Sequence, residues 1–164
     1  MPEPTEFDHR RFRNALGCFG TGVTIVTTLD ADGAPVGLTA NSFTSVSLDP
    51  ELLLVCLNRQ SKSLPVFEAA ETFAVNVLHV EQKELAQLFA MAAADRFRDT
   101  IWESGSTGAP IITGSLASFE CSTYAEYDGG DHLIMVGRVV DVRFDDESDP
   151  LLYYRGAYRE LHLD

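Results

Sequence analysis

The chain has 164 residues, enough for one domain with a single sizeable core. Its 45% hydrophobic and 23% charged residues are typical of a folded globular protein and exclude disorder over the whole length. The net charge of −13 argues against a nucleic-acid binder and against attachment to an anionic membrane surface. It leaves room for a small phosphate-bearing ligand, because one local pocket can oppose the overall charge.

No segment has the length of a membrane span. The longest apolar runs, residues 52–57 and 88–94, have six and seven residues, whereas a transmembrane helix needs about 20. The charged N-terminal residues are not followed by an apolar stretch, so they do not have the pattern of a signal peptide. We therefore expect a cytoplasmic protein.

The first elements in chain order are a helix and a hairpin. Residues 5–19 predict an amphipathic helix that Thr5 caps. The β-branched segment 23–30 and the segment 36–43 predict two strands, joined by a tight turn at Asp32-Gly33.

Two strands then alternate with two short helices. Residues 52–58 predict a buried strand, and 73–79 predict another. A helix over 61–70, capped by Ser63, lies between them. A second amphipathic helix is expected over 80–93, and the glycine- and proline-rich residues 94–114 are expected to form a loop.

The C-terminal third predicts a long hairpin. Its strands cover 115–127 and 132–144, an acidic loop follows at 145–149, and a tail runs over 151–161. Consecutive hairpins without βαβ units favour a closed antiparallel barrel, mainly β with short helices, in one domain over residues 1–164.

The cysteines and histidines do not predict a metal site or a disulfide. Cys18, Cys56 and Cys121 are widely spaced and odd in number, and the two inside strands are expected to be buried free thiols. The histidines are also far apart. Only His132 follows a turn, Gly129–Asp131, that would present its side chain, although a structural role remains an alternative.

Two polar clusters mark a candidate ligand site. In residues 38–47, small hydroxyl and amide side chains alternate with apolar ones, so that a flat ligand can approach the backbone; a polar edge strand is the alternative. In residues 58–63, hydroxyls and Lys62 open a helix and form a phosphate cradle, or only a good helix cap. Together they predict a ligand with a planar polar head and a phosphate, which a flavin nucleotide fits.

Other nucleotide and nucleophile motifs are missing. There is no P-loop, no Gly-x-Ser-x-Gly elbow and no His-Glu-x-x-His, and the glycines at 17, 20 and 22 precede a strand, where a dinucleotide fingerprint would follow one.

The chain resembles the short-chain flavin reductases, the flavin reductase-like family with the FMN-binding split β-barrel fold. The resemblance covers about residues 10–161 and rests on the order of several segments: TGVTIVTT (21–28), GLTANSFTSVSLDP (37–50), NRQSKS (58–63), FAVNVL (73–78), DRF (95–97), GAPII (108–112), GGDHLIMVGRVVDV (129–142) and PLLYYRGAYREL (150–161). It gives Asp95-Arg96-Phe97 no definite role.

The resemblance implies a homodimer in which NADH or NADPH reduces FMN or FAD, as in the reductase components of two-component flavin-dependent monooxygenases. It places His132 beside the nicotinamide, as the residue that seats it for hydride transfer. The cofactor-binding residues implied are Thr39, Ala40, Asn41, Ser42, Ser45, Val46, Ser47, Cys56, Leu57, Asn58, Ser61, Lys62, Ser63, Gly130, Asp131, Tyr154, Arg155 and Tyr158.

Two alternatives stay open from the sequence. A split barrel can bind flavin or haem without reductase activity, or oxidise pyridoxine phosphate, and the Gly-Asp-His turn at 130–132 favours a reductase. A dimeric scaffold protein would give the two polar clusters no purpose. The sequence does not distinguish NADH from NADPH or FMN from FAD, and it does not say whether the flavin stays bound.

Overall fold

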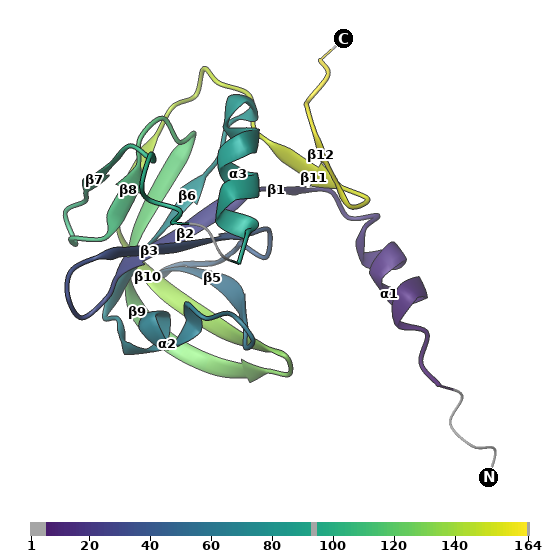
Figure 1. Ribbon diagram of the computed structural model, residues 1–164, viewed down its shortest axis with the longest axis horizontal. Coiled ribbons are helices and arrows are strands. Elements are labelled where there is room, and N and C mark those ends of the chain that lie inside the picture. The colour runs from purple at the N-terminus through teal and green to yellow at the C-terminus, as the bar shows by residue number, and fades with distance from the viewer. Residues whose placement is uncertain (1–5, 93–94, 164) are drawn as a thin grey trace.

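The computed structural model describes residues 6–92 and 95–163 and has the mainly β architecture expected (Figure 1). Within the described residues no helix is long and apolar enough to cross a membrane. In chain order the elements are α1 (His9–Leu16), β1 (Thr21–Gly22), β2 (Thr24–Leu29), β3 (Pro35–Ala40), β4 (Thr44–Leu48), β5 (Glu51–Asn58), α2 (Leu64–Ala69), β6 (Thr72–Val77), the 3-10 turn η1 (Val80–Gln82), α3 (Lys83–Ala90), β7 (Trp102–Ser104), β8 (Pro110–Ile112), β9 (Ala117–Gly129), β10 (His132–Phe144), β11 (Leu152–Tyr154) and β12 (Ala157–Arg159).

Seven strands form one antiparallel sheet in the order β3-β2-β6-β9-β10-β5-β4. No ladder joins its edge strands β3 and β4 in the described chain, so the barrel is split rather than closed. The hydroxyl of Ser42 bridges the opening: its Oγ accepts from the Cys56 N–H (2.9 Å) and donates to the Cys56 carbonyl (3.0 Å). The Ser42 side chain thus links the end of β3 to β5 at the opening, where the edge strands have no backbone ladder between them.

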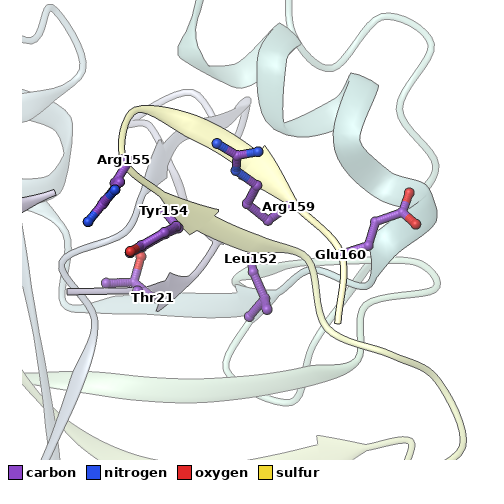
Figure 2. Close-up of a pocket in the computed structure, with 7 residues that line it drawn as sticks. Thr21, Leu152, Tyr154, Arg155, Arg159 and Glu160 are labelled. Atoms are coloured by element: carbon purple, nitrogen blue, oxygen red, sulfur yellow. The ribbon is translucent and has the colours of Figure 1, made fainter. Parts of the chain in front are cut away.

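A small arm extends from the barrel (Figures 1 and 2). We use this name for α1 together with the three-stranded sheet β1-β11-β12. The expected tail is therefore a hairpin, whose turn at Arg155-Gly156 has positive φ angles of 50° and 74°. Figure 1 shows α1 pointing away from the barrel, so this helix packs on none of its strands.

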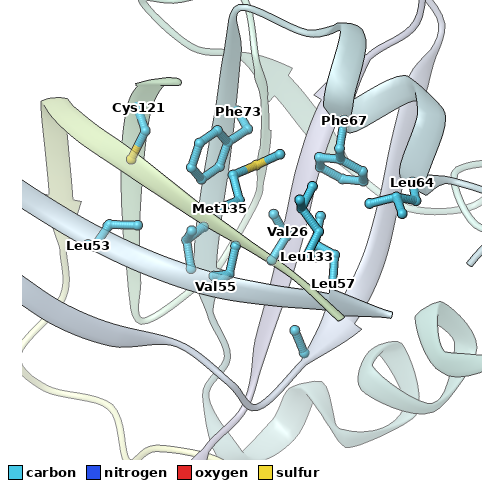
Figure 3. Close-up of a cluster of buried hydrophobic side chains, with 12 residues drawn as sticks. Val26, Leu53, Val55, Leu57, Leu64, Phe67, Phe73, Cys121, Leu133 and Met135 are labelled. Atoms are coloured by element: carbon cyan, nitrogen blue, oxygen red, sulfur yellow. The ribbon is translucent and has the colours of Figure 1, made fainter. Parts of the chain in front are cut away.

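The main core fills the barrel interior (Figure 3). Val26, Phe73 and Met135 lie inside it, and Phe67 of α2 closes it from one side. Strand β2 is buried on both faces because Ile25, the neighbour of Val26, belongs to a second core under α3. The packing of α3 on β2 and β3 fixes the position of β3 in the sheet. Strand β3 in turn lines the candidate site.

The helices differ from the sequence predictions at their ends. The proposed cap Thr5 lies outside the described residues, and α1 begins at His9, where Asp8 accepts the Arg11 N–H (2.9 Å). Helix α2 has six residues, and Ser63 at its N-cap position makes no side-chain cap bond. Helix α3 ends at Ala90.

Two short strands, β7 and β8, occupy part of the predicted loop 94–114. A buried carboxylate stabilises the turn between them: Glu120 is 1% exposed and accepts the Thr107 N–H (2.9 Å) and hydroxyl (2.7 Å). These bonds come from β9, so the local sequence of the turn does not reveal them.

The thiols and histidines lie largely where expected. Cys121 is buried, and burial together with the adjacent Glu120 raises the pKa of its thiol to about 12. Cys56 is half-buried instead of buried. His79 has a structural role, since its Nδ1 accepts the Glu81 N–H (3.2 Å). In the described parts of the chain, no group of three or more His, Cys, Asp or Glu side chains is placed to hold a metal ion.

Candidate functional site

A cavity of about 680 Å³ lies between β3, the end of β5, the start of α2 and the segment after α3. Its volume is within the range of small-molecule and cofactor sites. Many of the predicted cofactor-binding residues meet here: Thr39, Ala40, Asn41, Ser42, Cys56, Asn58, Ser61, Lys62, Ser63 and His132. The two polar clusters of the sequence therefore line one cavity.

The Thr39–Ser42 segment offers one uncommitted polar side chain. The Thr39 hydroxyl donates to the Ala86 carbonyl of α3 (2.6 Å), and Ser42 bridges to Cys56. Asn41 is exposed, and its amide makes no hydrogen bond within the described residues. An amide both donates and accepts, so Asn41 is the side chain of this segment that suits a heterocycle edge.

Strand β5 divides its residues between the cavity and the core. Cys56 and Asn58 line the cavity, while Leu57 is 0% exposed and belongs to the barrel interior. This alternation is the two-residue period of a strand. Burial raises the pKa of the Cys56 thiol, so the cavity wall is neutral at this position.

The segment Ser61–Ser63 supplies hydroxyls and a cation to the lining of the cavity. Lys62 is exposed, the two serines are half-buried, and the Ser63 N–H donates to Ser61 Oγ (3.3 Å). Because α2 is so short, its dipole is weak. Binding of a phosphate at this segment would depend on the Lys62 ammonium and on the two serine hydroxyls.

His132 is held at the cavity by the end of the long hairpin. Arg59 ties this turn to β5: its Nε donates to the Gly130 carbonyl (2.9 Å), and its N–H donates to the Asp131 carbonyl (2.9 Å). Its Nη2 also pairs with Asp128 (2.6 Å). Arg59 lies in the predicted polar cluster 58–63 but was not named as a cofactor-binding residue, and its bonds fix the turn that presents His132.

Asp131 orients the imidazole. The His132 Nδ1 lies 2.7 Å from Asp131 Oδ1, and this hydrogen bond is the main cause that holds the pKa of the Asp131 carboxyl below its usual range. Because the carboxylate oxygen accepts, we assign a proton to Nδ1, and Nε2 is the ring nitrogen that Asp131 does not engage.

An apolar wall of the cavity was not among the predicted site residues, although Leu38 lies within the predicted segment 38–47. It includes Val36, Leu38, Phe89 and Phe97. Gly37 lies between the two β3 residues, and a Cβ there would approach Phe89 Cε1 to 3.0 Å. The alternation of apolar side chains in 36–38 was a usable signal, whereas the contribution of α3 depends on tertiary packing.

The remaining predicted residues lie outside this cavity. Ser45, Val46 and Ser47 are on the edge strand β4, and Gly130 and Asp131 are in the hairpin turn beside it. The last three are Tyr154, Arg155 and Tyr158, which belong to the arm.

The arm has a second cavity of about 590 Å³ (Figure 2). It is lined by Tyr154 and Arg155, whose guanidinium lies 5.1 Å from the Tyr154 ring centre. Tyr158 instead packs edge-on against Tyr153 (5.4 Å). Within one chain, therefore, the tail and the main cavity are separate.

Comparison with protein families agrees with the family resemblance of the sequence. A family model described as "Flavin reductase like domain" matches residues 16–162. A "probable flavin reductase" of Rhizobium meliloti (strain 1021) is 48% identical over 153 residues, which cover 93% of this chain and 49% of that protein. The chain thus spans about half the length of this relative.

A second relative is covered more fully. It is the reductase subunit HsaB of a flavin-dependent monooxygenase of Rhodococcus jostii (strain RHA1), 45% identical over 157 residues, with 96% of this chain and 80% of that protein covered. Among solved structures, the NADH:FAD oxidoreductase SgcE6 of Streptomyces globisporus C-1027, in complex with NAD and FAD fragments, is similar with a TM-score of 0.90. It is 39% identical, and the match covers 96% of this chain and 94% of that one.

Proposed function

Because the chain belongs to the family of flavin reductase-like domains, we propose that it is an NAD(P)H:flavin oxidoreductase. It transfers a hydride from NADH or NADPH to FMN or FAD. The observation that carries this proposal is the single cavity that joins a free amide at Asn41, the phosphate-type donors at Ser61–Ser63 and an oriented His132.

The residues of the cavity fit a flavin. Asn41 matches the hydrogen-bonding pyrimidine edge, and Val36 and Leu38 match the apolar benzenoid edge. Lys62 with the hydroxyls of Ser61 and Ser63 matches the ribityl phosphate. Thr39 and Ala40 line the same cavity beside Asn41.

The protein's contribution is positioning rather than covalent catalysis. A bound flavin supplies the hydride-accepting ring. Asn41 and the apolar wall fix the plane of that ring, and His132, held by Asp131 and Arg59, fixes the nicotinamide against it. No nucleophile is needed, which agrees with a neutral Cys56 thiol in the cavity.

We also propose that the reduced flavin passes to a flavin-dependent monooxygenase. Support comes from HsaB, which is the reductase subunit of such an enzyme. Non-reductase binding of flavin or haem in the same barrel is the alternative, and the oriented His132 beside the cavity favours the reductase.

The test is NAD(P)H oxidation by the purified protein, followed at 340 nm under anaerobic conditions with and without added FMN or FAD. A reductase oxidises the nicotinamide in proportion to the flavin supplied. A protein that binds flavin and leaves NADH and NADPH unchanged would support the non-reductase alternative.

Replacing His132 by alanine should lower kcat/KM for the nicotinamide about tenfold, because a positioning contact is lost, and should leave the flavin Kd within about twofold. Steady-state kinetics with NADH and NADPH measure the first quantity, and flavin titration the second. His162→Ala, at an exposed histidine near the C-terminus, is the matched control. A lower melting temperature with unchanged kinetics would make His132 a structural residue only.

We further propose a homodimer in which α1 packs against the second chain. Phe12 and Leu16 of α1 are 49% and 57% exposed, Phe19 just after the helix is 78% exposed, and α1 buries no residue in its own chain. Such an apolar helix face normally has a partner. The two-fold arrangement would also bring the arm of each chain to its partner.

Light scattering should give twice the chain mass of 18.0 kDa for the wild-type protein. The double variant Phe12→Asp with Leu16→Asp should shift the mass toward that of one chain, since two charges cannot be buried in an apolar interface. A double variant that remains fully dimeric would place the interface elsewhere.

A further inference from the structure

Arg96 is a cation of the main cavity to which neither the sequence nor the proposed reaction has given a role. It follows α3 and reaches back to β3, where its Nη1 donates to the Gly37 carbonyl (2.5 Å). Its Nε and Nη2 both donate to the Met91 carbonyl (3.1 and 2.7 Å). Arg96 and both neighbours, Asp95 and Phe97, line the cavity.

Within residues 6–92 and 95–163, no carboxylate forms an ion pair with this guanidinium. The ion pairs in the described part of the chain involve Arg59, His132 and Arg143, and the three hydrogen bonds of Arg96 all go to neutral carbonyls. Half-burial of the side chain lowers its pKa, the direction expected when a charge loses water without gaining a counter-ion. A half-buried cation of this kind normally has an anion beside it.

Arg96 also keeps donors for such an anion. A guanidinium has five N–H groups, and the carbonyls of Gly37 and Met91 occupy three of them. The two that remain belong to Nη1 and Nη2, one on each nitrogen. A pair of this kind suits the two-point binding of a phosphate.

The lining of the cavity therefore includes two sets of phosphate donors that come from different parts of the chain. One is Ser61–Ser63 with the Lys62 ammonium, at the start of α2, and the other is Arg96, on the segment after α3. A mononucleotide such as FMN has one phosphate and needs one place. A dinucleotide has a diphosphate, whose second phosphate needs another.

We propose that Arg96 binds the second phosphate of a dinucleotide in this cavity, while Ser61–Ser63 hold the first phosphate of the flavin. The proposal rests on the proposed function, because it assigns a residue to the same cavity. The diphosphate belongs to FAD or to the nicotinamide nucleotide, and both present the same chemistry to the guanidinium.

Variants Arg96→Met and Arg96→Lys separate these sources. Dissociation constants are measured for riboflavin, FMN and FAD in the oxidised state, and KM is measured for NADH. If FAD is the ligand, Arg96→Met weakens FAD binding about 10- to 100-fold and leaves riboflavin and FMN within about twofold. If the nicotinamide nucleotide is the ligand, KM for NADH rises by a similar factor and all three flavins bind as before.

The lysine variant tests the two-point geometry. A lysine side chain keeps the positive charge but lacks the forked pair of donors, so Arg96→Lys should show a smaller loss for the same ligand than Arg96→Met. Arg98→Met, at an exposed arginine two residues away, is the matched control and should change none of these constants.

Three outcomes would overturn the proposal. Equal weakening of riboflavin, FMN and FAD would show that Arg96 only holds the wall through Gly37 and Met91. Equal weakening of FMN and FAD with riboflavin unchanged would place the first phosphate at Arg96. No change for any ligand would remove Arg96 from the site. The proposed function is judged separately, because wild-type protein that fails to oxidise NADH with added flavin refutes it whatever the Arg96 variants bind.

Discussion

Replacing Asn76 by leucine is expected to lower the free energy of unfolding by at least about 3 kcal/mol, because several buried polar groups lose their partner together. Asn76 is 0% exposed on β6. Its Nδ2 donates to the Ile25 carbonyl (3.0 Å) and to Thr27 Oγ1 (3.1 Å). Its Oδ1 accepts from the Ile112 N–H (3.1 Å) and the Ser118 hydroxyl (2.9 Å).

Thermal and urea unfolding measure this loss. A change of about 3 kcal/mol corresponds to a fall in Tm of roughly 6–12 °C for a chain of this size. Gln87→Leu removes an amide from the exposed face of α3 and should change the unfolding free energy by less than about 0.5 kcal/mol. Ser118→Ala removes one of the four hydrogen bonds of Asn76. Its loss of unfolding free energy should lie between the losses of Asn76→Leu and Gln87→Leu. An Asn76→Leu protein as stable as wild type would show that these bonds contribute little net stability.

Asn76 shows where prediction from the sequence ends. The apolar, β-branched pattern of 73–79 correctly predicted a buried strand, but one asparagine in it gave no sign of its partners on β2, β8 and β9. The strands β7 and β8 were missed for the same reason: the bonds that hold their turn come from Glu120, on another strand. Local patterns predict elements, whereas long-range polar bonds become visible only in the fold.

The candidate site was predictable to the extent that it is made of continuous segments. Residues 39–42 and 61–63 lie on one cavity as expected. The two-residue period of β5 would also have separated Leu57, which faces the core, from Cys56 and Asn58.

The two arginines that shape the site could not have been found in this way. Arg59 acts on Gly130, 71 positions away, and Arg96 acts on Gly37, 59 positions away. Apart from the ion pair of Arg59 with Asp128, the partners of both arginines are backbone carbonyls, and every residue has one. The side-chain type therefore carries no information about the pairing.

Removing the phosphate-type donors is the decisive test of the ligand itself. The triple variant Ser61→Ala, Lys62→Met, Ser63→Ala should raise the Kd of FMN about 100-fold or more. Charge-assisted hydrogen bonds contribute about 1.5–3 kcal/mol each, and a combined loss of about 3 kcal/mol gives this factor. The segment lies at the start of α2, with Lys62 exposed and both serines half-buried in the cavity wall.

Riboflavin separates a lost phosphate contact from a damaged cavity, because it has the same ring system without the phosphate. Its Kd should change less than about threefold in the triple variant, since Asn41 and the apolar wall are untouched. Lys83→Met, at the other lysine of the chain, controls for the general loss of one positive charge and should leave FMN binding unchanged. Wild-type affinity of the triple variant for FMN would move the phosphate away from Ser61–Ser63. Parallel loss of riboflavin and FMN would show instead that the segment maintains the shape of the cavity, because only a direct phosphate contact distinguishes the two ligands.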